Sequence, residues 1–228
     1  PGHSSAASDV YKRQVYKDHY YNYVDDGITI NEPIINTIKN GKIHNIDLII
    51  GSNNDEYSLY FGGIADVDGW LNAEVSDKQK NKLTKLLSNI DDPIRKLDLL
   101  ITAKNFVCPS LLIAKTVNLS GGNSWVYQFN RVRDDPKALK YGAFHGAELP
   151  YVFDTHDEWL PTNDIDRKIT EEVQSYWVQF SKTGNPNLEQ KMWDPYSAQT
   201  NSTFIINEKS YSSSHPSYEI CKIMEPSW

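Results

Sequence analysis

The sequence has few of the residues that crosslink a chain or bind metals. Its 228 residues include two cysteines, Cys108 and Cys221, which excludes a small disulfide-rich scaffold. It has no Cys/His cluster and no H-E-x-x-H motif, and Asp66-Val67-Asp68-Gly69 lacks the other acidic ligands of a calcium loop. No metal or other cofactor is therefore expected. We also find no run of about 18 apolar residues, so no membrane span is expected.

The composition is that of a chain that can bury a core. Hydrophobic residues make up 39% of it, with six tryptophans and fourteen tyrosines, which is far too aromatic for a disordered chain. A single domain is the default at this length. The net charge of −7 gives a surface that repels phosphate backbones, so a nucleic acid partner is not expected.

The beginning of the chain differs from the rest. It has no initial Met and no charged-then-apolar signal sequence. Pro1–Gln14 is small, polar and without periodicity, whereas aromatic residues are frequent from Val15 onward. We expect residues 1–14 to be a non-native or disordered tail, with an ordinary flexible terminus as the alternative. Residues 15–228 are expected to be part of something longer.

Three short apolar runs predict the strands of a sheet. Ile46–Ile50 is nearly continuous and ends at Gly51, which is typical of a strand buried on both faces. Ser124–Phe129 and Ser202–Ile206 are the other two. The predicted helices between and around them are Asn31–Asn40, Ser76–Leu87, Pro93–Ala103, Ser110–Asn118 and Ile165–Phe180. Strands separated by helices favour an α/β fold.

Several local signals refine this picture. Ser76 and Gln79 form a capping-box pattern, and Asn31 is the expected N-cap of the first helix. The apolar stripe of Ile165–Phe180 predicts core packing. Ser210–Ser217 is serine-rich and is expected to be an exposed loop. The histidines without a motif are expected at the surface; they are His3, His19, His44, His156 and His215.

Two side chains follow neighbouring predicted strands. Glu56 comes after Ile46–Ile50, and His145, between Gly142 and Gly146, comes after the next strand. Loops at the carboxyl ends of neighbouring parallel strands converge on one site. A carboxylate bonded to one imidazole nitrogen fixes the tautomer and stabilises the imidazolium. The pair would supply two members of a hydrolase triad, although a solvated acid and an ordinary loop histidine are more common.

The segments around both residues resemble those of the type B carboxylesterases, a family that includes the cholinesterases. I-I-G-S-N-N-D-E-Y-S-L-Y is similar to the acid-bearing segment of the family, and Y-G-A-F-H-G-A-E-L-P-Y-V-F to its histidine segment. V-D-D-G, F-V-C-P, Y-W-V-Q-F-S-K-T-G-N-P-N and W-D-P-Y also lie in family order. The resemblance covers roughly Tyr20 to the end. It implies the C-terminal part of an α/β-hydrolase fold, with mostly parallel strands and flanking helices.

The resemblance implies a serine hydrolase that acts on small carboxylic esters without a cofactor. Glu56 would be the acid, His145 the general base and Glu148 a residue that supports them. The serine of such enzymes lies in a G-x-S-x-G elbow. The nearest match, Gly2-His3-Ser4-Ser5-Ala6, lacks the second glycine and a preceding strand. Without nucleophile and oxyanion donors, which belong to a missing N-terminal part of the same domain, this chain alone would be inactive.

The resemblance also bears on the substrate pocket. Cholinesterases carry an aromatic residue three positions after the catalytic Glu and another two positions after the catalytic His, whereas this chain has Leu59 and Ala147. Both differences weaken a cation–π site for choline. Tyr60 matches an acyl-pocket aromatic. Tyr57 replaces the glycine that is usual in the family, and it would be strained if that position required a positive φ.

The two cysteines allow two interpretations, buried free thiols or a disulfide. The resemblance favours a Cys108–Cys221 disulfide, because secreted cholinesterase-like proteins bridge equivalent cysteines. Asn118-Leu119-Ser120 and Asn201-Ser202-Thr203 are N-glycosylation sequons. Together these features favour a secreted glycoprotein, with a cytoplasmic esterase as the alternative.

Two other functions remain open. One is a catalytically dead, cholinesterase-like adhesion or binding module, and the other is an unrelated α/β domain whose motifs match by coincidence. Sequence upstream of Val15 would separate them: a G-x-S-x-G after an apolar strand favours the enzyme, and a substituted serine favours the binding module.

Overall fold

The computed structural model describes residues 26–156, 161–189 and 193–225. The chain forms two compact units, residues 1–37 and 38–228. In the first unit, Asp26 closes a turn by accepting the backbone amides of residues 28–30, and α2 (Ile34–Lys39) begins before the boundary. The predicted tail, the Ser4 motif, His3, His19 and the first residues of the V-D-D-G segment lie outside the described residues.

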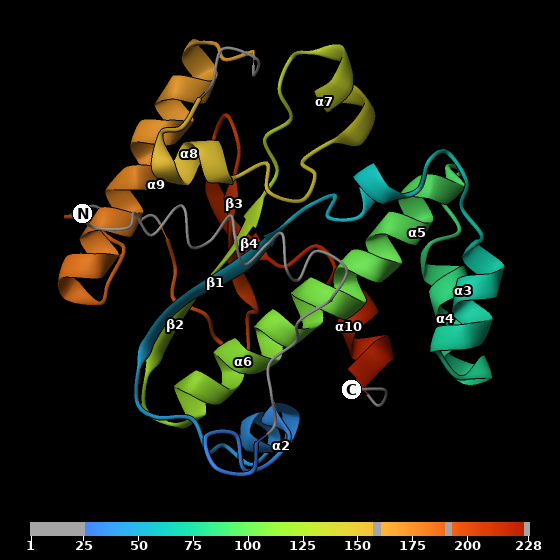
Figure 1. Cartoon of the computed structure of the whole chain (residues 1–228), viewed down its shortest axis with the longest axis horizontal. Helices are drawn as coiled ribbons and strands as arrows, with labels where there is room; N and C mark the ends of the chain where they lie inside the picture. Colours follow the sequence, from blue (N-terminus) through green and yellow to red (C-terminus); the bar gives the residue numbers. More distant parts are fainter. Residues whose placement is uncertain (1–25, 157–160, 190–192, 226–228) are drawn as a thin grey trace, which may run out of the picture. The chain divides into compact units, whose positions relative to one another are not determined.

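A sheet organises the second unit, and four of its strands lie in the described residues (Figure 1). They run in the order β1 (Asp47–Asn53), β2 (Asn123–Phe129), β3 (Ser202–Ile206) and β4 (Tyr211–Ser214). The first three are parallel, and β4 pairs antiparallel with β3. The predicted α/β class is confirmed, and the three predicted strands form within a few residues of their predicted bounds.

Alternation along the strands sends side chains to two separate cores. Ile50 and Val126 face α5 (Pro93–Thr102) and α6 (Cys108–Leu119), where they pack with Leu100 and Ala114. Their neighbours on the other face pack against α9 (Asp164–Thr183); these are Ile49, Trp125, Tyr127 and Phe129. Figure 1 shows the sheet between α6 and α9. The apolar stripe of α9 is core packing, as predicted.

Helices α5 and α6 form one continuous run through a π-helical turn, Ala103–Val107. By length and composition the run Pro93–Leu119 could cross a membrane, but 56% of its apolar window is buried inside the domain. It also packs against β1 and β2. A core helix of a globular domain passes the same test, so the packing favours that role, and the absence of a membrane span stays a prediction.

The other elements in the described part of the chain are short. They are the 3₁₀ turn η1 (Ser58–Tyr60), α3 (Val67–Glu74), α4 (Asp77–Leu86), α7 (Pro136–Tyr141), α8 (Leu149–Phe153) and α10 (Tyr218–Met224). The predicted capping box of Ser76 and Gln79 is present at the start of α4, and α9 ends at Gly184 with φ +73°. Asp66, the first residue of the Asp66–Gly69 segment, caps α3 by accepting the amide of Gly69.

Four details of the prediction are wrong. The strand β1 is only partly buried, with its apolar residues 48–50 all half-buried, because it forms the edge of the sheet in the described residues. Asn31 is not the N-cap of α2, which begins at Ile34. The serine-rich segment is not all loop, since Tyr211–Ser214 forms β4. His215 is buried rather than exposed.

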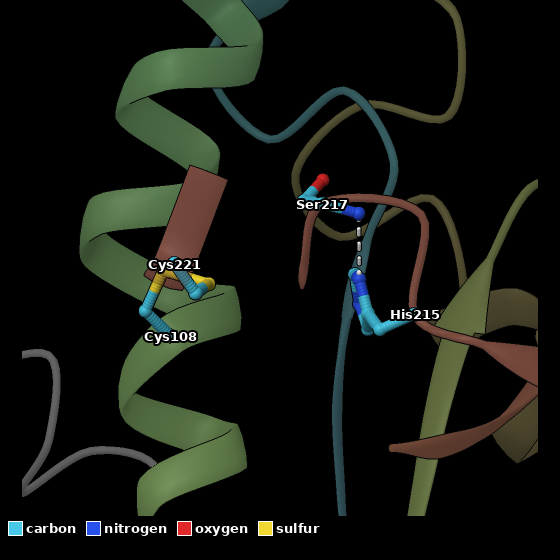
Figure 2. Close-up of a disulfide and its surroundings, with 4 residues drawn as sticks. All are labelled: Cys108, His215, Ser217 and Cys221. Carbon is cyan, nitrogen blue, oxygen red and sulfur yellow. Dashed lines mark hydrogen bonds between the residues drawn. A yellow bond between two sulfur atoms is a disulfide. The ribbon is translucent and has the colours of Figure 1, made fainter. Parts of the chain in front are cut away.

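Cys108 and Cys221 form a disulfide, which joins α6 to α10 (Figure 2). His215 lies on the segment that leads into α10, and its Nδ1 accepts the amide of Ser217 at 3.1 Å. Its ring is therefore neutral in the fold, and burial lowers the pKa of His215 to about 3. The disulfide and this turn both hold α10 against the core that contains Leu100 and Ala114.

Both sequon asparagines serve the fold. The Asn118 amide donates to the Tyr196 carbonyl at 2.8 Å, and its oxygen accepts the Ser124 hydroxyl at 2.7 Å. Asn201 is 5% exposed and accepts the Tyr196 hydroxyl. A glycan on Asn118 would be attached to Nδ2, the nitrogen that donates the hydrogen bond to the Tyr196 carbonyl. Glycosylation stays a prediction, and this geometry does not favour it in the folded domain.

Replacing Cys108 and Cys221 together with serine should lower the free energy of unfolding by about 4–5 kcal/mol, because the bond closes a loop of 113 residues. Urea denaturation of the variant and the parent chain measures the difference. As a control, a thiol reagent should label neither cysteine in unreduced, denatured protein. Labelling of both would contradict the bond.

His215 should make stability depend on pH. Its pKa is about 3 when folded, against 6.5 for an unperturbed histidine. Its stabilising contribution is therefore complete above pH 6.5 and is lost as the pH falls towards 3. Asn at position 215 can still accept the Ser217 amide but cannot be protonated. The variant His215→Asn should lose less stability over this range, measured by denaturation at several pH values, whereas the exposed-site variant His44→Asn should follow the parent.

Candidate active site

Parallel pairing of β1 and β2 brings two distant loops together. The strands stay in register up to Asn53 and Phe129, and the amide of Asn54 then donates to the Phe129 carbonyl at 3.0 Å. Beyond the sheet, a parallel bridge pairs Asp55 with Phe144. Glu56 and His145 are the next residues on each side, so they meet although 89 residues separate them.

Glu56 and His145 form a hydrogen-bonded pair. His145 Nδ1 lies 2.7 Å from Glu56 Oε2, and the amide of Asn53 donates to the other carboxylate oxygen, Oε1, at 2.7 Å. Glu56 is 4% exposed, whereas the side chain of His145 is 52% exposed. With Glu56 ionised, Nδ1 carries the proton and donates, so Nε2 is the nitrogen that can exchange a proton with a third group.

Burial dominates the electrostatics of the acid. It raises the pKa of Glu56 above its usual value, and the negative charge of Glu148 adds to the rise. The amide of Asn53 and the imidazole of His145 act in the opposite direction because they favour the ionised form. A proton gained at Nε2 would place an imidazolium beside this carboxylate, where the two charges attract.

Asn53 connects the acid, the histidine loop and Glu148. Its side-chain amide donates to the Phe144 carbonyl at 2.8 Å and also to Glu148 Oε2. Asn53 is buried, and its own backbone amide binds Glu56. Sequence reasoning missed Asn53, although it stands inside the acid-bearing motif. Its place three residues before Glu56, inside that motif, is the signal that could have identified it.

Glycines shape the loop that carries His145. Gly142 has φ +69° and Gly146 has φ +84°, so the expected tight turns are present on both sides of the imidazole. The ring of Phe106, from the π-helical turn, lies 5.6 Å from the His145 ring between centroids. His145 is therefore held by Glu56 at one edge and contacted by an aromatic ring.

The predicted pocket residues lie on both loops. Leu59 and Tyr60 are exposed on η1, directly after the acid. Ala147 lies on the histidine loop and packs against the core that contains Phe129. Tyr57 has φ −102°, so the side chain at this position causes no backbone strain. A role in substrate binding stays a prediction for all three pocket residues.

In the ranges that the structure describes, no group of three or more His, Cys, Asp or Glu side chains is placed to hold a metal ion. The chemistry that the residues themselves can support is proton transfer at His145 Nε2, assisted by Glu56.

Comparison with known proteins identifies the family. The carboxylesterase family model matches residues 71–223, which is more than half of the chain and includes His145 and both cysteines but begins after Glu56. The para-nitrobenzyl esterase of Bacillus subtilis (strain 168) is 28% identical over 197 residues, covering 81% of this chain and 39% of that protein. Acetylcholinesterase 1 of Caenorhabditis briggsae is 24% identical over 217 residues, covering 77% and 35%.

Solved structures agree on the fold. A PNB esterase superposes with a TM-score of 0.72 at 25% identity, covering 90% of this chain and 44% of that one. A carboxylesterase of Geobacillus stearothermophilus gives 0.74 at 20% identity, covering 96% and 49%. The fold is thus that of α/β-hydrolase esterases, and the chain spans less than half the length of these relatives. By sequence and by fold, the chain belongs to the carboxylesterase family.

Proposed function

We propose that the protein that contains this chain hydrolyses carboxylic esters with a Ser–His–Glu triad, in which Glu56 and His145 are the acid and the base. The bond of 2.7 Å between His145 Nδ1 and the buried Glu56 carboxylate is the observation that carries the proposal. It gives the geometry that an orienting acid and a general base require. Membership of the carboxylesterase family supports ester hydrolysis in general.

The proposed mechanism follows from that geometry. A serine that lies outside this chain attacks the ester carbonyl carbon, and His145 Nε2 takes the serine proton. The tetrahedral intermediate then collapses, and the imidazolium returns the proton to the departing alcohol. Water attacks the acyl-enzyme in a second round of the same transfers. Glu56 accepts a hydrogen bond from Nδ1–H throughout, stays ionised and stabilises the imidazolium, while Asn53 and Glu148 support the acid and the histidine loop.

We propose uncharged esters as the substrate class. Leu59 and Ala147 stand where cholinesterases, which this sequence resembles, carry aromatic residues. Aliphatic side chains offer no cation–π attraction for a quaternary ammonium group. Tyr60, which is exposed beside the acid, is the proposed contact with the acyl group.

We propose an extracellular location, because a disulfide between Cys108 and Cys221 is the kind of bond that oxidising compartments preserve. A cytoplasmic esterase is the alternative.

Changing His145 to Ala in the full-length protein should lower kcat for a para-nitrophenyl ester by about 10⁴–10⁶-fold, because the general base is lost. Glu56→Gln should lower it by about 10⁴-fold, because the amide favours the wrong tautomer. Neither change should raise KM greatly, because both residues act in proton transfer and not in binding of the ester. Steady-state kinetics with matched purification checks both values.

The exposed-site variants His44→Ala and Glu171→Gln are the matched controls and should keep the parental rate. Parental activity in His145→Ala or Glu56→Gln would overturn the proposed triad. A folded full-length protein that hydrolyses no ester would favour the binding module instead.

The chain of 228 residues alone should not hydrolyse a para-nitrophenyl ester above the rate of a buffer blank, because it lacks a serine elbow and oxyanion donors. Turnover can be followed by the release of nitrophenolate, with the full-length protein as the positive control. Clear turnover that the change Ser4→Ala abolishes would contradict this prediction.

A further inference from the structure

Asp55, the residue before the acid, binds the histidine loop through both its backbone and its side chain. Its amide donates to the Ala143 carbonyl at 3.0 Å, and its Oδ2 accepts the Ala143 amide at 2.9 Å. These bonds form a closed ring between the two loops. Ala143 lies two residues before His145 and is itself fully buried, so the ring fixes the loop close to the imidazole.

Helix α5 holds Asp55 from the other side. Arg95 Nη1 pairs with Asp55 Oδ1 and lies 3.2 Å from Asp98 Oδ2. The other oxygen of Asp98, Oδ1, accepts the amide of Tyr57 at 2.8 Å. Asp55 and Tyr57, the residues on either side of Glu56, are therefore both attached to α5.

Gly142 shows how closely Asp55 approaches the loop. A Cβ at position 142 would overlap Asp55 Oδ2, and the backbone there has φ +69°. The carboxylate occupies the space that a side chain would need. The contact between Asp55 and the histidine loop therefore constrains two residues of that loop, Gly142 and Ala143.

We infer that Asp55, held by Arg95, is a positioning residue that sets the distance between Glu56 and His145. This inference rests on the proposed function of that pair. Asp55 does not touch the reacting atoms; it acts through the backbones of Glu56 and of the histidine loop. A site of this kind needs its groups held within about 0.5 Å of the productive geometry.

The number of attachments distinguishes this role from simple stabilisation. The Asp55–Arg95 ion pair is only partly buried, with 32% of the Arg95 side chain exposed, and solvent and desolvation both reduce what such a pair adds to stability. Asp55 also joins three segments that are far apart in sequence: the acid loop, the histidine loop and α5. The loss of the carboxylate should therefore loosen the Glu56–His145 bond more than it lowers overall stability.

The test measures the tautomer of His145 in this chain by ¹⁵N NMR of the imidazole at a pH where the ring is neutral. The parent should hold the Nδ1–H tautomer through Glu56. In Asp55→Asn, the ratio of the Nδ1–H to the Nε2–H tautomer should fall roughly fivefold, the effect of weakening one hydrogen bond. Exchange of the Ala143 amide with solvent should rise at least about tenfold.

Two controls separate positioning from folding. Asp166→Asn removes another buried carboxylate, which pairs with Arg131 at 2.8 Å; it should lower Tm and leave the His145 tautomer unchanged. Asp154→Asn removes the exposed partner of Arg167 and should change neither. If Asp55→Asn does not fold, the variant Arg95→Met replaces it in the test. Arg95→Met removes the ion pair but keeps the Asp55–Ala143 bonds. It should therefore shift the tautomer ratio of His145 in the same direction by a smaller factor.

An unchanged tautomer ratio and unchanged Ala143 exchange in the folded variants would overturn the inference, whatever their loss of stability. In the full-length enzyme, Asp55→Asn should lower kcat by about 10–100-fold with little change in KM, the effect of a small misplacement of the base. If His145→Ala retains activity, the proposed function fails, but the tautomer result in this chain still tests whether Asp55 positions the imidazole.

Discussion

The parallel pairing of β1 with β2 is the constraint on which the candidate site depends. Both strands run in the same direction, and their carboxyl ends, Asn53 and Phe129, lie side by side. The residues that follow each strand must therefore share one volume, whatever the length of chain between them. A one-residue slip of this register would turn Asn53 to the opposite face. It would also separate Asn53 from Phe144 and Glu148.

The site buries polar groups at a cost that the local hydrogen bonds offset. Glu56 is removed from water but receives the Asn53 amide and the His145 imidazole. Compensation is incomplete, since Asn53 Oδ1 has no hydrogen-bond partner among the described residues. An unpaired buried oxygen costs about 1–3 kcal/mol. A fold optimised for stability alone would avoid this cost, which is typical of a functional site.

The sequence predicts the elements whose signals are local. The capping box of Ser76 and the apolar stripe of α9 determine their helices without reference to the rest of the chain. The strand Tyr211–Ser214 has no such signal, because its serines join the sheet through the backbone of β3. The contact between Asp55 and Ala143 is equally invisible, since it depends on the register of two strands and on the position of α5. Motif resemblance located Glu56 and His145, but only coordinates identify what holds them.

The helical run Pro93–Leu119 links the site to the rest of the domain. Arg95 and Asp98 in its first half attach to the acid loop, and Phe106 in its π-helical turn contacts the imidazole. Cys108, two residues later, is bonded to α10. π-helical turns are often found at functional sites, and this one carries Phe106 between the ion pair of Arg95 and the disulfide of Cys108. The apolar character of the run follows from packing against β1 and β2, whereas Arg95 and Asp98 bond to the loop that carries Glu56. Displacement of this helix would therefore alter the Glu56–His145 geometry from two directions, through Arg95 and through Phe106.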